Sequence, residues 1–330
     1  MRHLRRPVSF AYRTHFNQAY GLREWAVRIH GRLNHTWLGT SPTGKVLLGK
    51  DDWMFLGGRS YADGYRFLYP FAAAELHQWR DRLLDRYEVC RSIDARYYFT
   101  VSPDKATIYP EFWPDSYAKL NPGSCLSQLA DFLVDDARIS LIDVRQALRD
   151  GKAGDRLYHK TDSHWNQLGA FIAYRVIIER VRREFPEIEP LRLAEAAAQH
   201  ESGSAGDLAR MIGLRFVLTE DRVSPRLASR PEPTMKDGSP LDLAVLNIRD
   251  GSQRRHTVCR TGEVDRAVVF HDSFGYQLIP YLAYHFKEAH FMGTGRLFDE
   301  KEIRALRPSV VIDQLVERRL AEGAQVTVNK

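Results

Sequence analysis

Hydrophobic positions in the first third of the chain switch between helical and strand spacing. Apolar residues recur at helical intervals over residues 16–36, which predicts a helix. Residues 45–58 hold two apolar runs around a polar turn and end in two glycines, a pattern that predicts a β-hairpin. After Pro70, residues 71–92 carry an amphipathic helical pattern, and residues 95–103 form an apolar run typical of a buried strand.

The rest of the chain continues this alternation. Residues 131–150 predict the end of a helix, a strand and another helix, and residues 166–184 predict a helix that stops before a proline. The apolar run at residues 267–270 predicts a strand, followed by a sharp turn and a helix over residues 274–286. Two more short strands are predicted, at residues 290–295 and 308–316.

Strands that alternate with helices predict an α/β fold, with a mainly parallel sheet covered by helices on both faces. Residues 203–262 differ, because Gly, Pro, Ser and Arg become more frequent there and the apolar runs shorten. We expect a smaller β-rich insertion on one edge of the sheet at these positions. A chain of 330 residues is long enough for one large domain or two small ones.

Net charge and composition exclude few classes of binding partner. The net charge of +6 leaves nucleic acid, an anionic polysaccharide or a membrane surface open as partners, but 48 basic residues are scattered among 42 acidic ones. We find no nucleic-acid-binding motif and expect no nucleic-acid partner. The twelve histidines show no metal-ligand spacing, so we expect no metal and no cofactor.

Neither the N-terminus nor the cysteines fix the compartment. No stretch approaches the roughly 18 apolar residues that span a bilayer, and the basic N-terminus has no apolar core behind it, so it is no signal peptide as written. The three cysteines, Cys90, Cys125 and Cys259, form no CxxC motif. One disulfide with a spare thiol and three buried thiols both remain open.

The segment YHKTDSHWNQLGAF, residues 158–171, places an acid and a base just before a predicted helix. In an extended segment, Asp162 and His164 leave the same side of the backbone, so the carboxylate can orient the imidazole ring. Ser273 lies in the turn between a predicted strand and a predicted helix, where free backbone N–H groups can hold an oxyanion. Together the three residues suggest a nucleophile, its base and the acid that orients the base.

Other interpretations of the same residues stay open. A serine before a helix is commonly an N-cap, and a D-x-H pair at a helix start commonly caps it on the surface. Asp272 could replace Asp162 as the orienting acid, and His271 could replace His164 as the base, although a residue adjacent to Ser273 normally points away from it. No G-x-S-x-G motif is present.

Several motifs together resemble one family, the alginate-type polysaccharide O-acetyltransferases of the AlgJ/AlgX kind in the SGNH hydrolase-like superfamily. They are GLREW, VLLGKDDWMFLGG, VSPDKATIYPE, YHKTDSHWNQLGA, GDLARMIGL, HDSFG and RPSVVIDQLVER, between about Leu22 and Arg318. TDSHWN followed by HDSFG is the specific part of the resemblance. The D-x-H motif precedes the serine motif, as in a circular permutation of the usual order, and His271 stands where a glycine is usual.

The resemblance implies a three-layer α/β/α sandwich and a ping-pong acetyl transfer. Ser273 would be the nucleophile that accepts the acetyl group, His164 the base and Asp162 its orienter. The acceptor would be a polysaccharide outside the cytoplasm, and a membrane-bound O-acyltransferase would supply the acetyl group within a membrane-associated complex. Residues 1–40 would form a helical stalk whose membrane anchor is missing, and residues 41–330 the acetyltransferase domain.

Side chains near these motifs are candidates for holding the polymer, because aromatic rings suit sugar faces and cations suit an anionic chain. The candidates are Trp53, Arg59, Lys105, Tyr109, Trp165, Asn166 and Tyr276. Two alternative functions remain: an acetyl esterase with the same triad, because water and a sugar hydroxyl would enter the same site, and a non-catalytic polysaccharide-binding scaffold.

Overall fold

The computed structural model describes residues 40–228, 232–241, 254–293 and 298–321, together with Ile29 and Gly31. The helix predicted over residues 16–36 and the stalk predicted over residues 1–40 lie outside these ranges, except for Ile29 and Gly31, which are both helical. In the described part of the chain, no helix is long and apolar enough to cross a membrane.

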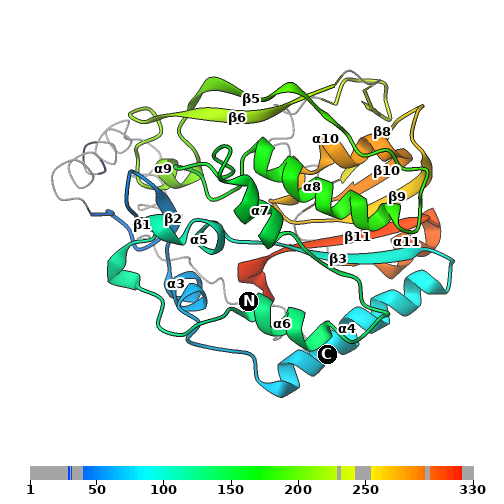
Figure 1. The fold of residues 1–330 in the computed structure, drawn as a ribbon, viewed down its shortest axis with the longest axis horizontal. Helices are drawn as coiled ribbons and strands as arrows, with labels where there is room; N and C mark the ends of the chain where they lie inside the picture. Colours follow the sequence, from blue (N-terminus) through cyan, green and yellow to red (C-terminus); the bar gives the residue numbers. More distant parts are fainter. Residues whose placement is uncertain are drawn as a thin grey trace, which may run out of the picture.

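A seven-stranded sheet forms the centre of the fold (Figure 1). Its strands, in spatial order, are β4 (Leu141–Asp143), β3 (Arg96–Ser102), β11 (Val310–Val316), β9 (Val264–Phe270), β10 (Phe286–Met292), β8 (Arg254–Val258) and β7 (Thr234–Met235). The first five strands are parallel, whereas β8 and β7 continue the sheet in antiparallel pairing. This arrangement confirms the predicted α/β class with a mainly parallel sheet.

Helices cover both faces of the sheet, which gives three layers (Figure 1). One face carries α7 (Arg145–Gly151), α8 (Gln167–Arg182) and α10 (Ile279–Leu282), and the other carries α4 (Ala73–Arg91), α6 (Cys125–Leu133) and α11 (Glu300–Leu306). Alternation along β3 explains the two cores: Tyr98 packs with α8, whereas its neighbours Tyr97 and Phe99 pack with α4. Buried apolar residues of the parallel strands therefore supply both cores.

Smaller elements surround the sheet. The predicted hairpin is formed by β1 (Val46–Leu48) and β2 (Met54–Leu56), which pair antiparallel and pack against α9 (Asp207–Met211). A second antiparallel pair, β5 (Leu193–Ser204) and β6 (Thr219–Leu227), lies over the α8 side of the sheet (Figure 1). The other short elements are α3 (Arg59–Tyr65), α5 (Lys105–Ile108) and the 3₁₀ turns Pro110–Phe112, Asp115–Tyr117, Gly275–Gln277, Ala283–His285 and Glu317–Arg319.

Two predicted elements differ from the structure. The β-rich pair begins at Leu193, before the predicted insertion, and part of the predicted insertion is β8, a strand of the main sheet. The helix predicted over residues 274–286 is three short turns, because Pro280 lacks the N–H that would continue a helix and a new turn begins there. The boundaries of the domain and of the insertion stay predictions.

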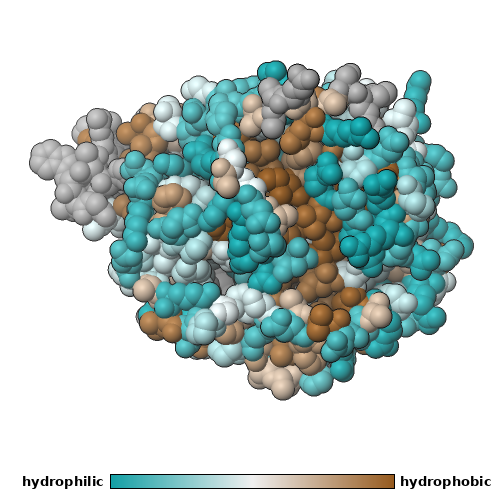
Figure 2. Space-filling model, in the orientation of Figure 1, coloured by the Kyte–Doolittle hydropathy of each residue, from teal (hydrophilic) through white to brown (hydrophobic). Residues whose placement is uncertain are grey.

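The surface is mostly hydrophilic, as expected for a chain with 27% charged residues. Figure 2 shows a strip of apolar residues across the middle of the face seen in Figure 1, with hydrophilic residues on either side.

Candidate active site

A short closed loop carries the acid and the base. Tyr158 and Trp165 form an antiparallel bridge at its base, and the His159 N–H donates to the His164 carbonyl at 3.2 Å. The segment between them is bent rather than extended, which corrects our expectation. Asp162 Oδ1 accepts from the backbone N–H of His164 at 3.0 Å, a turn in which an aspartate bonds the backbone two residues on. This turn, not strand alternation, brings the two side chains together.

The three predicted catalytic side chains lie within hydrogen-bond distance of one another. His164 Nδ1 lies 2.7 Å from Asp162 Oδ1, and His164 Nε2 lies 2.9 Å from Ser273 Oγ. The second oxygen of Asp162 accepts from the backbone N–H of Asp207 at 2.9 Å. The His164 ring packs against Phe274, with 4.9 Å between the centroids. Segments 109 positions apart thus meet at one point, as the sequence suggested.

Charges around His164 favour its protonated form. Burial alone would lower the pKa of His164, but the hydrogen bond and charge of Asp162, with the charge of Asp207, raise it above 6.5. Burial alone would raise the pKa of Asp162, but the hydrogen bond and charge of His164 bring it well below the usual aspartate value. The ring can therefore take a proton while the carboxylate beside it stays ionised.

A buried network fixes the turn that carries Ser273. Asp272 accepts hydrogen bonds from the backbone N–H groups of Phe274 and Val316, at 2.9 and 2.6 Å, and from the Gln314 amide at 3.1 Å. Gln314 also accepts from the Asp272 N–H at 3.0 Å. Asp272 is thus committed to the turn and is not available to orient His164.

The residue before Asp272 serves the same turn. His271 Nδ1 lies 2.8 Å from the Asp272 carbonyl, its ring is buried, and it meets Tyr276 edge-on at 4.9 Å. Burial lowers the pKa of His271. In the described part of the chain, Ser273 N–H has no hydrogen-bond acceptor, so it can bind an oxyanion. The turns that follow Ser273 in the chain are too short to give a strong helix dipole. We therefore expect the Ser273 N–H to contribute more than a helix dipole to the stabilisation of an oxyanion.

Lys105 holds the acid–base loop from inside the protein. Its side chain is 1% exposed, and its Nζ donates to the carbonyls of Asp162, His159 and Lys160 at 2.7, 2.9 and 3.1 Å. Burial lowers the pKa of Lys105 to about 7, against the opposing charges of Asp162 and its neighbours. We expected Lys105 to meet an anionic polymer. That expectation is wrong, because the ammonium group is enclosed and fully committed.

Two acidic residues that sequence reasoning missed complete the support. Glu220, on β6, accepts from the Thr161 backbone N–H at 2.8 Å and also from the Thr161 hydroxyl and the Lys160 N–H. Asp207, at the start of α9, accepts from the Ser163 N–H and hydroxyl at 2.8 and 2.7 Å. Asp207 lies in the GDLARMIGL motif, but nothing local indicates the role of either residue, because each acts on a segment more than 40 positions away.

A polar cleft of about 670 Å³ opens beside the triad. Asp162 and Gln277 line it on the triad side, and three arginines line it elsewhere, Arg210, Arg215 and Arg222. Its remaining walls come from the β5–β6 pair and the start of α9. Of the triad, Asp162 contributes to the lining, so the cleft adjoins the acid–base loop.

Most of the aromatic candidates for polymer binding are core residues. Trp53 is 3% exposed and stacks on Phe112 at 4.6 Å, and Tyr109 is buried with its hydroxyl accepting from the Leu157 N–H at 2.9 Å. Trp165 is 1% exposed, and its indole N–H donates to the Phe274 carbonyl at 3.1 Å. Their enclosed rings offer no face to a sugar, which corrects this part of the prediction.

The remaining candidates for polymer binding are Asn166, Tyr276 and Arg59. Asn166 is fully buried and is the N-cap of α8, where its side chain accepts from the Gly169 N–H at 2.9 Å, so it does not contact a substrate. Tyr276 is also buried, against His271. Arg59 is the first residue of α3, and its side chain is outside what the structure describes.

The cysteines are all thiols. Cys90 and Cys259 are buried and Cys125 is partly exposed, and none is in a disulfide. Burial raises the pKa of Cys90 to about 12 and that of Cys125 to about 11, so neither is an activated nucleophile. The three cysteines are therefore free thiols, of which two are buried, whereas the alternative expected all three to be buried.

Two groups of side chains in the described ranges place metal-ligating atoms within 4.8 Å of one another. One group consists of Asp162, His164 and Asp207, where both His164 nitrogens already face Asp162 and Ser273. The other group, His256, Glu288 and His290, lies on the neighbouring strands β8 and β10.

Comparison with solved structures supports the fold. The chain superposes on PatB1 of Bacillus cereus with a TM-score of 0.58 and 15% identity, over 83% of this chain and 96% of that one. It superposes on the O-acetyltransferase domain of Pseudomonas putida AlgJ with a TM-score of 0.51 and 20% identity, over 83% of this chain and 91% of that domain.

Comparison of sequences identifies the family. A probable alginate O-acetylase AlgJ of Azotobacter vinelandii is 25% identical over 168 residues, which is 49% of this chain and 40% of that relative. The chain thus aligns with less than half the length of this curated relative. Residues 46–241 match the profile of a family described as the SGNH hydrolase-like domain of the acetyltransferase AlgX. This match covers more than half of the chain, which therefore belongs to the AlgX family of SGNH hydrolase-like acetyltransferase domains.

Proposed function

We propose that this protein transfers acetyl groups to hydroxyls of a polysaccharide through an acetyl ester on Ser273. The observation that supports it most strongly is the continuous contact from Asp162 Oδ1 to His164 Nδ1, at 2.7 Å, and from His164 Nε2 to Ser273 Oγ, at 2.9 Å. A serine hydroxyl is a weak nucleophile that needs a base at this distance. Asp162 holds the ring so that Nε2 is the nitrogen that faces the serine.

In the first half-reaction, Ser273 Oγ attacks the carbonyl carbon of the acetyl donor. Its proton moves to His164 Nε2, and the ionised Asp162 stabilises the resulting imidazolium. The oxyanion of the tetrahedral intermediate is held by the Ser273 N–H. When the intermediate collapses, the bond to the donor's leaving group breaks, the leaving group takes the proton from His164, and the acetyl group stays on Ser273 Oγ.

In the second half-reaction, a sugar hydroxyl approaches from the polar cleft. It gives its proton to His164 Nε2 and attacks the acetyl carbon, and Ser273 Oγ leaves and regains the proton. Transfer outruns hydrolysis when the hydroxyl is held in place, since good positioning is worth about 7–11 kcal/mol of barrier. The cleft is lined by both charges, with Arg210, Arg215 and Arg222 beside four carboxylates, and such polar groups can hold the hydroxyls of a sugar.

The proposal also covers the setting of the reaction. We place the acceptor polysaccharide outside the cytoplasm, and we assign supply of the acetyl group to a membrane-bound O-acyltransferase in a membrane-associated complex. Support comes from membership of the AlgX family and from the similarity to relatives named as alginate O-acetylases.

Mass spectrometry after incubation with an activated acetyl ester tests the proposal. We expect one acetyl adduct on the peptide that contains Ser273, and none in Ser273→Ala. Ser92→Ala is the matched control, because Ser92 is an exposed serine at the end of α4, and it should keep the adduct. An adduct that survives in Ser273→Ala, or none in the unaltered protein, would refute the nucleophile.

A second measurement separates a transferase from an esterase. Release of the chromogenic leaving group is followed with and without oligosaccharide. If the acetyl group leaves the enzyme at the same rate in both cases and no acetylated sugar forms, the protein is an esterase. If no leaving group is released at all, the non-catalytic scaffold gains support.

A further inference from the structure

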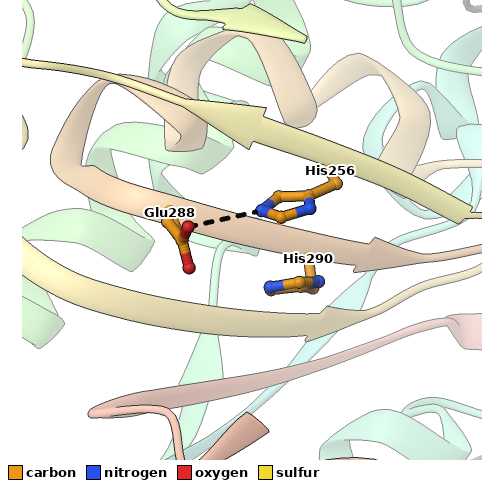
Figure 3. A group of neighbouring side chains, drawn as sticks. All are labelled: His256, Glu288 and His290. Carbon is orange, nitrogen blue, oxygen red and sulfur yellow. Dashed lines mark ion pairs between the residues drawn. The ribbon is translucent and has the colours of Figure 1, made fainter. Parts of the chain in front are cut away.

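A cluster of two histidines and a glutamate, none of them in the proposed triad, lies on the neighbouring antiparallel strands β8 and β10 (Figure 3). His256 on β8 is directly opposite His290 on β10 in the antiparallel pair. Glu288 precedes His290 by two positions, and strand residues two apart share one face. The ladder therefore brings all three side chains to the same face of the sheet.

The distances suit a metal ion. The two imidazole rings are 4.0 Å apart between centroids, and His256 Nε2 lies 3.9 Å from Glu288 Oε1. One ligand atom from each residue lies within 4.8 Å of the others. A tetrahedral zinc ion at about 2.1 Å from each ligand needs these atoms about 3.4 Å apart. Binding of the ion would therefore require the side chains to rotate toward one another.

One potential ligand atom in the cluster has no hydrogen-bond partner in the described structure. His256 Nε2 is shielded from solvent and has no hydrogen-bond partner, although a buried polar atom normally has one. Figure 3 shows this nitrogen facing the Glu288 carboxylate.

The two carboxylate oxygens of Glu288 have different charged partners. Oε2 is held by Arg266, whose Nη2 and Nε lie 2.8 and 3.0 Å away, as a partner outside the coordination sphere would hold a ligating carboxylate. Oε1 faces His256 and is shared with Lys236 Nζ at 2.9 Å. The Lys236 side chain is 57% exposed, so it can swing into solvent and leave Oε1 to a cation.

We propose that His256, Glu288 and His290 bind a divalent transition metal ion of the zinc class, with Lys236 as the group that the ion displaces. Two imidazoles and a carboxylate oxygen are a donor set that suits zinc and leaves a fourth position for water. The ion would join β8 to β10. Its consequence is stabilisation of the antiparallel edge of the sheet, whatever reaction the protein performs.

Cobalt(II) is a visible probe for this site. The full chain is treated with a chelator and titrated with Co²⁺, and we expect the absorption bands of a four-coordinate site, which Zn²⁺ then abolishes. His256→Ala and His290→Ala should each weaken binding by at least about tenfold. His77→Ala is the matched control, because His77 is exposed on α4 and away from the cluster, and it should bind as the unaltered protein does.

Lys236→Met supplies a readout that does not depend on removing a ligand. It should tighten Co²⁺ binding by about two- to fivefold, because the ion no longer has to break an exposed ion pair. Circular dichroism of each metal-free variant checks that the fold is kept. Binding that is equal in the unaltered protein and in both histidine variants, or that is missing at millimolar metal, overturns the proposal. Since acetyl transfer is not measured, failure here leaves the proposed function untouched.

Discussion

Replacing Lys105 with methionine tests whether a buried lysine holds the proposed catalytic loop. Methionine keeps most of the length and the apolar stem of the side chain, whose Nζ lies over the rings of Trp53 and Phe55 at 5.6 and 5.2 Å from their centroids. It removes only the ammonium group. The carbonyls of His159, Lys160 and Asp162 then lose the donor that now lies 2.7–3.1 Å away.

The expected cost follows from two opposing contributions. Each hydrogen bond from a charged donor contributes about 1.5–3 kcal/mol, so three such bonds set an upper limit near 9 kcal/mol. Against this, burial of an ammonium group costs several kcal/mol that methionine does not incur. The difference leaves a loss of about 3–5 kcal/mol in the free energy of unfolding, the range found when one partner of a buried charged contact is removed.

Activity should fall further than stability alone explains. The shortest of the three bonds, 2.7 Å, ends on the carbonyl of Asp162, so the acid that orients His164 loses its anchor. A displacement of about 1 Å at a catalytic group costs about 10²-fold in rate. We therefore expect kcat of Lys105→Met to fall by about that factor at a temperature where the variant is still folded.

Two measurements on two variants decide the matter. Denaturant unfolding gives the loss in stability, and release of a chromogenic acetyl leaving group gives kcat. Lys301→Met is the matched control, since Lys301 is exposed on α11. It should change the free energy of unfolding by no more than about 0.5 kcal/mol and leave kcat as it is in the unaltered protein. A Lys105→Met protein as stable and as active as the control would refute the role of this lysine as the anchor of the loop.

Three further predictions concern the acid and the base. In Gly206→Ala the new Cβ would stand 2.3 Å from Asp162 Cβ, so we expect kcat to fall by about 10²-fold, whereas Gly64→Ala, with open space around its Cβ, should retain the activity. Because the pKa of His164 is raised above 6.5, kcat/KM should fall as the pH is lowered, with a midpoint above pH 6.5. Asp207→Asn removes a charge 4.0 Å from His164 Nδ1 and should therefore lower this midpoint. The same raised pKa means that the stability from the Asp162–His164 pair is fully present below pH 6.5 and is lost as pH rises through the folded-state pKa, which denaturant unfolding against pH measures.

Most of the fold could be predicted from hydrophobic periodicity, because the structure of long, strongly patterned segments depends little on distant contacts. The strand at residues 95–103 and the helix at residues 166–184 were found close to their observed bounds, Arg96–Ser102 and Gln167–Arg182. The helix predicted after Ser273 was wrong where a single proline interrupts an apolar pattern. An apolar run alone does not distinguish one helix from several short turns that are equally buried.

The sequence singled out three side chains that the structure places in contact, Asp162, His164 and Ser273, but not the groups that hold their backbone. Few residue types can act as acid, base and nucleophile in a triad, so an Asp, a His and a Ser at such positions are informative. Lys105 and Glu220 act on the backbone of the loop from distant segments, and a lysine or glutamate in a polar stretch looks like any surface charge. Trp53 shows the same limit, because its sequence does not tell a core ring from a sugar platform.

The site is best understood as two halves that are anchored separately. The loop with Asp162 and His164 is fixed by Lys105 and by acids from β6 and α9, whereas the turn with Ser273 is fixed by Asp272 and β11. In the described structure, side chains of the loop bond the turn at two points: His164 to the Ser273 hydroxyl, at 2.9 Å, and the Trp165 indole to the Phe274 carbonyl, at 3.1 Å. Because the second bond does not involve the reacting atoms, it can keep the halves in register while the first is made and broken. This gives Trp165 a physical reason to follow the base directly in sequence.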